Sequence, residues 1–125
     1  MNTLHHSNNP TGQWLYDAKG ILVWTDLTCF DTLEWMGNAI NNYAWGKGKL
    51  IFYKDNQPIA WYEGNMKDGK CSGHGSFTYE NGDVYNGEWE DGMPSGYGIL
   101  QSQDGKTVEG DWLKGRKKSF FAFLL

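Results

Sequence analysis

The sequence predicts an all-β protein built from consecutive β-hairpins. Three observations support this prediction: glycines recur with a period of 23 residues, apolar and polar residues alternate with a period of two, and turn-forming dipeptides separate the alternating runs. No segment carries a strong helical signal. We therefore expect one domain of hairpins that extends from about Gly12 to the C-terminus.

Composition limits the classes of function. Aromatic residues make up 16% of the 125 residues, which is too high a share for a disordered chain. A net charge of −4 disfavours nucleic acid and anionic lipid as partners of the chain as a whole. No signal-peptide pattern and no apolar run of bilayer length is visible, so we expect a cytoplasmic protein.

Residues that could bind a metal or form disulfides are few. Cys29 and Cys71 are too isolated for a disulfide framework or a paired-cysteine zinc site, and both are expected to be buried or neutral thiols. His5 and His6 have no third ligand nearby. The sequence therefore predicts no metal site and no cofactor.

The N-terminal residues divide into a tail and a cap. Residues 1–10 are expected to be disordered. Residues 11–34 contain "GQWLYDAKGILVWTDLTCF", which has strand composition around a turn at "DAKG". We expect a capping hairpin or a decayed repeat there.

Residues 35–125 carry about three repeats and a C-terminal capping hairpin. The stretches "GNMKDGKCSGHGSFTYENGDVYN" and "GEWEDGMPSGYGILQSQDGKTVE" align without a gap, and their glycines coincide. The first unit, "WMGNAINNYAWGKGKLIFY", has similar spacing, with Asn42 at a turn position that favours left-handed backbone. Its four additional residues are expected in a longer turn at "KDNQPIA", which contains Pro58.

Each unit has one apolar and one solvated face. In "YNGEWE", residues 85–90, aromatic residues and glycine alternate with polar residues, as in a half-buried strand. Glycine on the apolar face allows a ring from a neighbouring strand to lie flat on the backbone. Glycine and large rings therefore occur together because the rings fill the space that glycine leaves.

The stretch "YNGEWEDGMPSGYG" resembles the MORN motif, in which Tyr-any-Gly-any-Trp is followed by a glycine and then by a Gly-any-Gly pair. The resemblance covers residues 35–118 and implies hairpins stacked into an elongated, twisted, single-layer antiparallel sheet. Met66 and Ala39 replace the motif tryptophan, and Val108 replaces the tyrosine. The first unit also resembles the opening repeat of bacterial MORN-repeat proteins.

The resemblance implies a non-catalytic scaffold or interaction module, with a regulatory or accessory role, that presents a repeat surface to a protein partner. A second copy of the chain is an alternative partner. The candidate partner-binding residues are the ring positions of the repeats and two neighbouring acids: Trp35, Tyr62, Tyr85, Trp89, Trp112, Glu88 and Glu90.

The C-terminal "KGRKKSFFAFLL" supports two interpretations. Its basic residues before an apolar end suit peripheral binding to phospholipid headgroups, which is the alternative function, through Lys114, Arg116, Lys117 and Lys118. In the repeat frame, however, Phe121 and Phe123 take the positions of Gly98 and Leu100, as expected of a closing strand. We favour the closing strand.

A small hydrolase or transferase is the third hypothesis. The sequence contains no nucleophile elbow, phosphate-binding loop or metalloprotease motif. His74 lies near Cys71 in sequence but lacks a third group that would orient it as a base, so it is expected to be a surface residue. No catalytic residue and no enzymatic activity are predicted.

Overall fold

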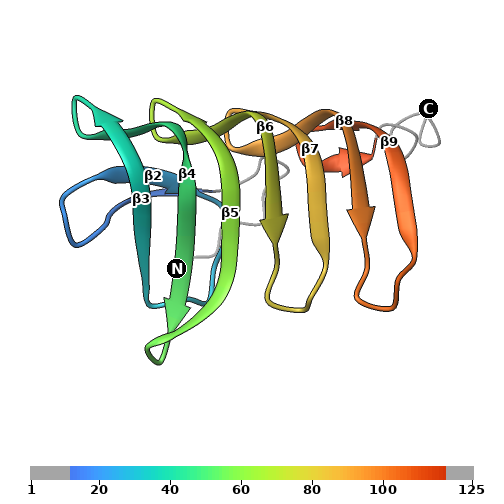
Figure 1. Cartoon of the computed structure of the whole chain (residues 1–125), viewed down its shortest axis with the longest axis horizontal. Helices are drawn as coiled ribbons and strands as arrows, with labels where there is room; N and C mark the ends of the chain where they lie inside the picture. The colour runs from blue at the N-terminus through green and yellow to red at the C-terminus, as the bar shows by residue number, and fades with distance from the viewer. Residues whose placement is uncertain (1–11, 118–125) are drawn as a thin grey trace.

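The computed structural model describes residues 12–117, all of which lie in strands, turns or loops (Figure 1). The ten strands form one open sheet, which confirms the predicted all-β class. They are β1 (Gln13–Tyr16), β2 (Leu22–Thr25), β3 (Thr32–Ile40), β4 (Tyr43–Lys54), β5 (Gln57–Lys67), β6 (Lys70–Thr78), β7 (Val84–Glu90), β8 (Met93–Gln101), β9 (Thr107–Leu113) and β10 (Arg116–Lys117). Across the described range, no helix is long and apolar enough to cross a bilayer.

The strands from β3 to β10 form an antiparallel meander in sequence order, so the hairpins lie side by side along the long axis (Figure 1). At one end of the strands the hairpins close with two-residue turns in which both residues have positive φ. These turns are Asn41–Asn42, Asp68–Gly69, Asp91–Gly92 and Lys114–Gly115. Such turns match the twist of the strands that they join. We call this row of four turns the turn ladder.

The expected long turn at "KDNQPIA" is wrong. Asp55 and Asn56 close β4 and β5 with a two-residue turn, and both have positive φ, of 52° and 63°. Pro58 lies within β5 opposite Tyr53, next to a bulge in the ladder. The additional residues therefore lengthen the two strands, to 12 residues in β4 and 11 in β5.

Large rings cover the backbone of glycines on the inner face of the sheet. Tyr62 lies over Gly75 and Tyr85 lies over Gly98, so that a Cβ atom at either glycine would overlap the ring. Tyr62 and Tyr85 are 0% and 1% exposed. Their hydroxyls each donate to the carbonyl oxygen three residues later, as does Trp35 through Nε1, at 2.7–2.9 Å. The predicted packing of rings on glycine is therefore present.

The motif tryptophans tie neighbouring hairpins together. Nε1 of Trp89 donates to the carbonyl oxygen of Gly75 at 3.0 Å, and Nε1 of Trp112 donates to that of Gly98 at 3.1 Å. Trp89 also packs edge-on against Tyr62, with ring centroids 5.2 Å apart. Each of these bonds spans 14 residues and joins two repeats, which stabilises the stack in addition to the strand ladders.

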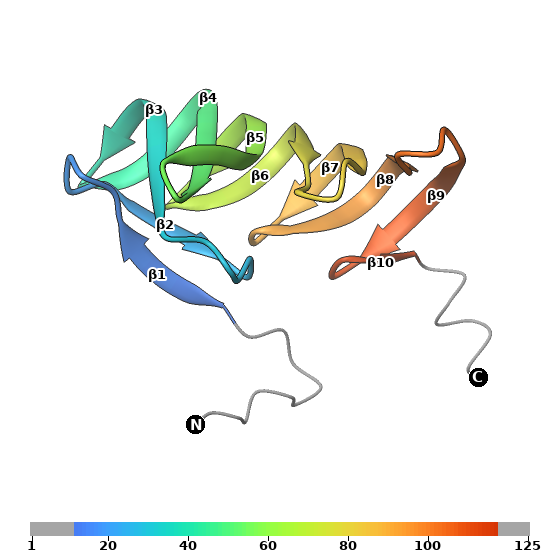
Figure 2. The same cartoon turned by 90° about the horizontal axis from the view of Figure 1, so that it is seen from below.

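The hairpin β1–β2 lies below the N-terminal end of the meander (Figure 2). It joins the sheet through a parallel pairing of Leu22 with Tyr43, so the sheet is not antiparallel throughout. Its turn covers the open edge of β3: Asp17 Oδ2 accepts from the Trp35 backbone N–H at 3.1 Å, and Lys19 Nζ donates to the Trp35 carbonyl oxygen at 2.9 Å. Side chains therefore satisfy backbone groups that a neighbouring strand would otherwise bind.

Asp17 is the centre of this cap. Its carboxylate also accepts from the backbone N–H groups of Lys19 and Ile21, at 2.9 and 3.0 Å. Burial alone would raise the pKa of Asp17, but the three backbone donors and the charge of Lys19 outweigh it and hold the pKa below its ordinary value. The folded structure therefore favours the ionised carboxylate.

The predicted tail at residues 1–10 and the closing strand that contains Phe121 and Phe123 lie outside the described residues. Both stay predictions.

Candidate functional site

The ring positions predicted to bind a partner are mostly packing residues. Trp35, Tyr62, Tyr85 and Trp89 are at most 5% exposed, and Trp112 is half-buried. Glu88 and Glu90 are exposed on the opposite face of β7, because alternate residues of a strand point to opposite sides. The structure therefore does not bring the rings and the acids together.

The remaining residues of interest in the sequence are placed as follows. Glu88 Oε2 lies 3.4 Å from His74 Nδ1, and both side chains are exposed. Lys114 is exposed in the last turn of the turn ladder. Arg116 and Lys117 form β10, and Lys118 lies outside the described residues. Cys71 is buried as expected, whereas Cys29 is exposed.

The turn ladder is held together by a repeated hydrogen bond. In the last three turns, the second residue donates its N–H to a carbonyl oxygen of the hairpin before it: Gly69 to Ala44, Gly92 to Cys71 and Gly115 to Pro94, at 2.8–3.0 Å. Each acceptor is the second residue after the preceding turn. The repeat therefore sets out a regular row of turn backbone along one side of the sheet.

Strand β2 lies along the first part of this row. The backbone N–H of Leu22 donates to the Asn42 carbonyl oxygen at 2.7 Å, and that of Trp24 donates to the Gly69 carbonyl oxygen at 2.8 Å. Every second residue of the strand thus binds a successive turn. β2 ends at Thr25, before it reaches the turns at Gly92 and Gly115.

Tryptophan rings from the same hairpin cover the turn glycines. A Cβ atom at Gly69 would lie 2.7 Å from the ring of Trp14, and one at Gly92 would lie 2.5 Å from the ring of Trp24. Gly115 differs, since a Cβ atom there would meet no described atom within 4 Å. The last position of the turn ladder is open in the described part of the chain.

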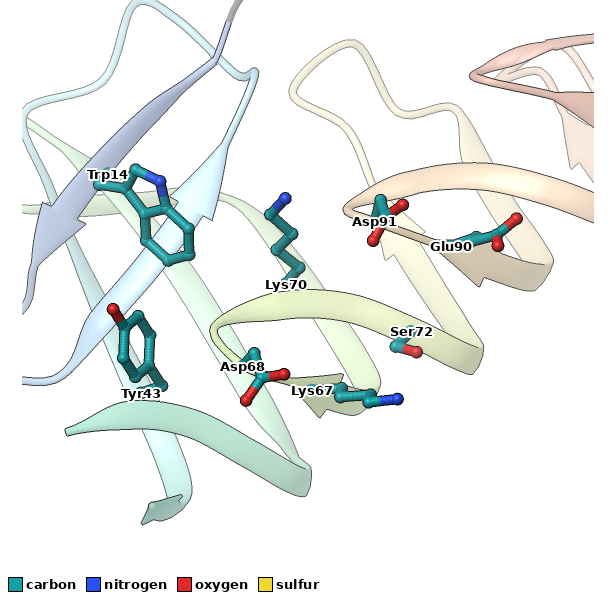
Figure 3. A pocket seen from close by; sticks show the side chains of 8 residues that line it. All are labelled: Trp14, Tyr43, Lys67, Asp68, Lys70, Ser72, Glu90 and Asp91. Carbon is teal, nitrogen blue, oxygen red and sulfur yellow. The ribbon is translucent and has the colours of Figure 1, made fainter. Parts of the chain in front are cut away.

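A hollow of about 640 Å³ runs beside the first turns (Figure 3). In Figure 3, Lys70 stands between Trp14 on one side and Asp91 on the other. Its Nζ atom lies 5.9 Å from the ring centroid of Trp14 and 5.5 Å from that of Trp24, which is cation–π geometry. We call this the ladder hollow; its lining is Trp14, Tyr43, Lys67, Asp68, Lys70, Ser72, Glu90 and Asp91.

A second, smaller hollow of about 150 Å³ lies where β2 leaves the turn ladder. Its lining includes the segment Trp24–Leu27, the core side chains Phe77 and Trp89, and Pro94 and Gly115 at the last two turns. We call this the inner hollow. It adjoins the two turn positions that β2 does not reach.

The inner hollow contains one carboxylate. Asp26 is exposed as a residue, but burial of its carboxyl raises the pKa above its ordinary value. Burial, and in second place the charge of Asp26, also raise the pKa values of Cys71 and Tyr79. The charge of Asp26 therefore contributes to the raised pKa values of two groups that line the inner hollow.

The described thiol and imidazole closest to one another in sequence, those of Cys71 and His74, differ in their surroundings. Burial keeps the Cys71 thiol protonated, and His74 is engaged with Glu88. Residues 12–117 contain no group of three or more side chains placed to hold a metal ion. The groups that lie along the turn ladder are backbone carbonyls, aromatic rings and carboxylates, all of which can take part in binding.

A family model for the MORN repeat matches residues 62–84 and 85–107. Residues 62–107 are thus two MORN repeats. The two matched segments begin at Tyr62 and Tyr85, whose rings cover glycine in successive hairpins. The start of each family repeat therefore coincides with the start of each packing unit. MORN repeats are a non-catalytic repeat family, generally associated with interaction with proteins or membrane lipids. Comparison with curated proteins finds no match to this chain.

The glycine period predicts the turns of the MORN repeats but not the strand that binds to them. Trp14 and Trp24 lie in the predicted cap and pair across β1 and β2. Tryptophans in a strand and glycines in turns together indicate that rings can cover the glycine backbone. Here the tryptophans and the glycines are far apart in sequence, so the sequence does not show which ring covers which glycine. No sequence pattern indicates a role for Asp26, because its neighbours Thr25 and Leu27 are uncharged and form no motif with it.

Proposed function

We propose that this protein is a non-catalytic interaction module that binds an extended segment of a protein partner along the turn ladder. The observation that carries the proposal is the mode in which β2 binds, with N–H groups of alternate residues on successive turn carbonyls. Among the described residues, no turn or loop N–H group bonds the carbonyl oxygens of Gly92 and Gly115. A second extended segment can continue the line of β2 at these positions.

Charge indicates what kind of segment fits. The ladder hollow is lined by three acids, Asp68, Glu90 and Asp91, and by two lysines, Lys67 and Lys70, and the chain as a whole carries a net charge of −4. Opposite charge on a partner favours association and limits it to the right partners. We therefore expect a partner segment that is extended and basic.

A matched pair of variants tests this site. Gly115→Asn places a side chain on the open turn position, and its backbone suits asparagine because Asn42 occupies the equivalent position with a φ of 69°. Gly105→Asn is the control, since Gly105 also has positive φ and open surroundings but lies in a turn at the other end of the strands. Each tagged full-length protein is used to capture partners from the native cell, which are identified by mass spectrometry.

We expect a partner to be retained by the wild type and by Gly105→Asn but lost by Gly115→Asn. A partner that both variants retain equally would show that the turn ladder is not the binding surface. Light scattering of the purified proteins reports whether the captured partner is a second copy of this chain.

Peripheral membrane binding is the second candidate function. The supporting observation is that Lys114 is exposed in the last turn, directly before the basic residues Arg116, Lys117 and Lys118. If membranes are the partner, the full-length protein will sediment with anionic vesicles, and salt will weaken the binding. Equal recovery with anionic and neutral vesicles would exclude this electrostatic mode.

A further inference from the structure

We infer that the inner hollow binds an organic cation, the ammonium or guanidinium group of a side chain on the partner segment. This inference rests on the proposed function, because it names the group by which a segment on the turn ladder would be recognised. The hollow adjoins Gly92 and Gly115, the turn positions that come next after β2. A side chain of a segment bound there would reach it directly.

Aromatic rings form much of the hollow. Phe77 stacks on Tyr79 with ring centroids 4.5 Å apart, and it lies 6.0 Å from Trp89. Trp24 and Phe52 also line the hollow. Cations bind over ring faces because the π-system is negative there, and several rings around one cation form an aromatic cage.

The carboxylate of Asp26 supplies the complementary charge. It forms no ion pair with any side chain described between residues 12 and 117. Asp26 is exposed, but most of the side chains that line the hollow with it are apolar, and partial burial of the carboxyl raises its pKa. A cation bound there would gain the attraction of the opposite charge in addition to that of the rings.

The protein already binds one of its own cations in this way. Lys70 Nζ lies 5.5 Å from the ring centroid of Trp24 and lines the ladder hollow, whereas the described lining of the inner hollow includes no lysine or arginine. Trp24 therefore takes part in one cation contact and also lines a hollow in which no described cation accompanies the carboxylate. The ring that holds the ammonium group of Lys70 is thus one of the rings of the inner hollow.

The size of the hollow selects a small head group. Its volume of about 150 Å³ is roughly five times the ~30 Å³ that one water molecule occupies in the liquid. This suits a guanidinium or a methylated ammonium group with its last methylene. It excludes a whole aromatic side chain together with the cation.

Small cations test the hollow without any partner. Choline, N-acetyl-arginine amide and N-acetyl-lysine amide are titrated into the 15N-labelled full-length protein, and the indole N–H signals are followed by NMR. We expect the signals of Trp24 and Trp89 to shift. The signal of Trp61, which carries Lys49 at 5.7 Å, serves as an internal control and is expected to stay.

Two comparisons separate charge from apolar contact. The neutral isostere of choline, 3,3-dimethylbutan-1-ol, is expected to bind about tenfold more weakly, since it keeps the shape but loses the cation–π attraction. Asp26→Asn is expected to weaken choline binding by about the same factor, while the control Asp104→Asn, a surface residue on the opposite side of the sheet, leaves it unchanged. Equal binding of choline and the isostere would overturn the inference.

Two further outcomes would reassign the hollow. If replacing Arg116, Lys117 and Lys118 by glutamine strengthens choline binding tenfold, the chain's own basic segment occupies the hollow and the assignment to a partner is wrong. If choline binds tenfold more tightly than both amides, the ligand is a free quaternary ammonium compound. Because these titrations need no partner, their result is independent of whether Gly115→Asn releases one.

Discussion

The substitution Gly98→Ala tests the contact on which the repeat depends. A Cβ atom at Gly98 would lie 2.5 Å from Cε1 of Tyr85 and closer still to its hydroxyl oxygen. Tyr85 is 1% exposed, and its hydroxyl donates to the Glu88 carbonyl oxygen at 2.9 Å. The ring must therefore move away from Gly98, lose this hydrogen bond, and disturb its edge-on contacts with Trp89 and Trp112.

The expected cost follows from these contacts. Overpacking of a core costs about 1–3 kcal/mol, and the lost hydrogen bond costs about 1 kcal/mol. Alanine restricts the unfolded chain and returns about 0.4–1 kcal/mol, since Gly98 does not have left-handed backbone. We expect a net loss of about 2–3 kcal/mol, which lowers the melting temperature of a chain of this length by roughly 6–15 °C.

Thermal and urea unfolding of the full-length protein measure this loss, with a double-mutant cycle to assign it. In a Tyr85→Leu background the smaller side chain leaves room at Gly98, so Gly98→Ala should cost little or should stabilise. Gly105→Ala is the control for backbone strain alone, because Gly105 has a φ of 91° and open surroundings. A Gly98→Ala cost that is unchanged in the Tyr85→Leu background would refute the ring-on-glycine argument.

Four further predictions concern other parts of the fold. Asp17→Asn should destabilise the protein by about 2–3 kcal/mol at pH 7. Because the pKa of Asp17 is lowered in the folded state, its contribution to stability is present above the unfolded pKa of ~3.9 and is lost as the pH falls. The melting temperatures of the two proteins should therefore converge between pH 7 and pH 3. A difference in melting temperature that stays constant with pH would contradict this. Trp89→Phe should lower the free energy of unfolding by about 1 kcal/mol, because it removes the hydrogen bond to a carbonyl oxygen of the preceding hairpin. Trp89→Ala should cost ~3–5 kcal/mol. An equally large cost for Trp89→Phe would show that loss of the hydrogen bond does not account for it. A thiol reagent should label Cys29 but not Cys71 in the native protein and both in denaturant; two reactive thiols in the native protein would contradict the burial of Cys71. Deletion of residues 120–125 should lower the melting temperature in the absence of lipid if they close the sheet, and an unshifted melt would show that they do not.

The parts of the fold that could be predicted from sequence are those that depend on local chemistry repeated at a fixed period. The glycine columns and the alternation in 85–90 gave the hairpins, the turns and the inward direction of Tyr85 and Trp89, because strand periodicity and left-handed turns are properties of adjacent residues. The length of β4 and β5 was missed, because Pro58 suggested a turn, whereas proline is tolerated in a strand beside a bulge.

The candidate site could not be predicted in the same way. The contacts of Trp14 and Trp24 join residues separated by more than 50 positions, and nothing in either stretch specifies its partner. The same holds for Asp17, whose hydrogen bond to the Trp35 backbone depends on where the hairpin β1–β2 settles. The chain's period sets out the turn ladder, but only the folded structure shows which strand occupies it.

The cap at Asp17 and Lys19 has a consequence for assembly. Because these side chains occupy the backbone groups of Trp35, β3 cannot accept a strand from another molecule at that point. Among the described strands, β1 and β10 are the other edges of the sheet, since each of them pairs with one neighbour. The same edge pairing with itself gives a closed two-fold dimer, whereas an open fibre needs two different edges to join. The side chains of Asp17 and Lys19 therefore remove the backbone of Trp35 from the edges through which this stack of hairpins could extend.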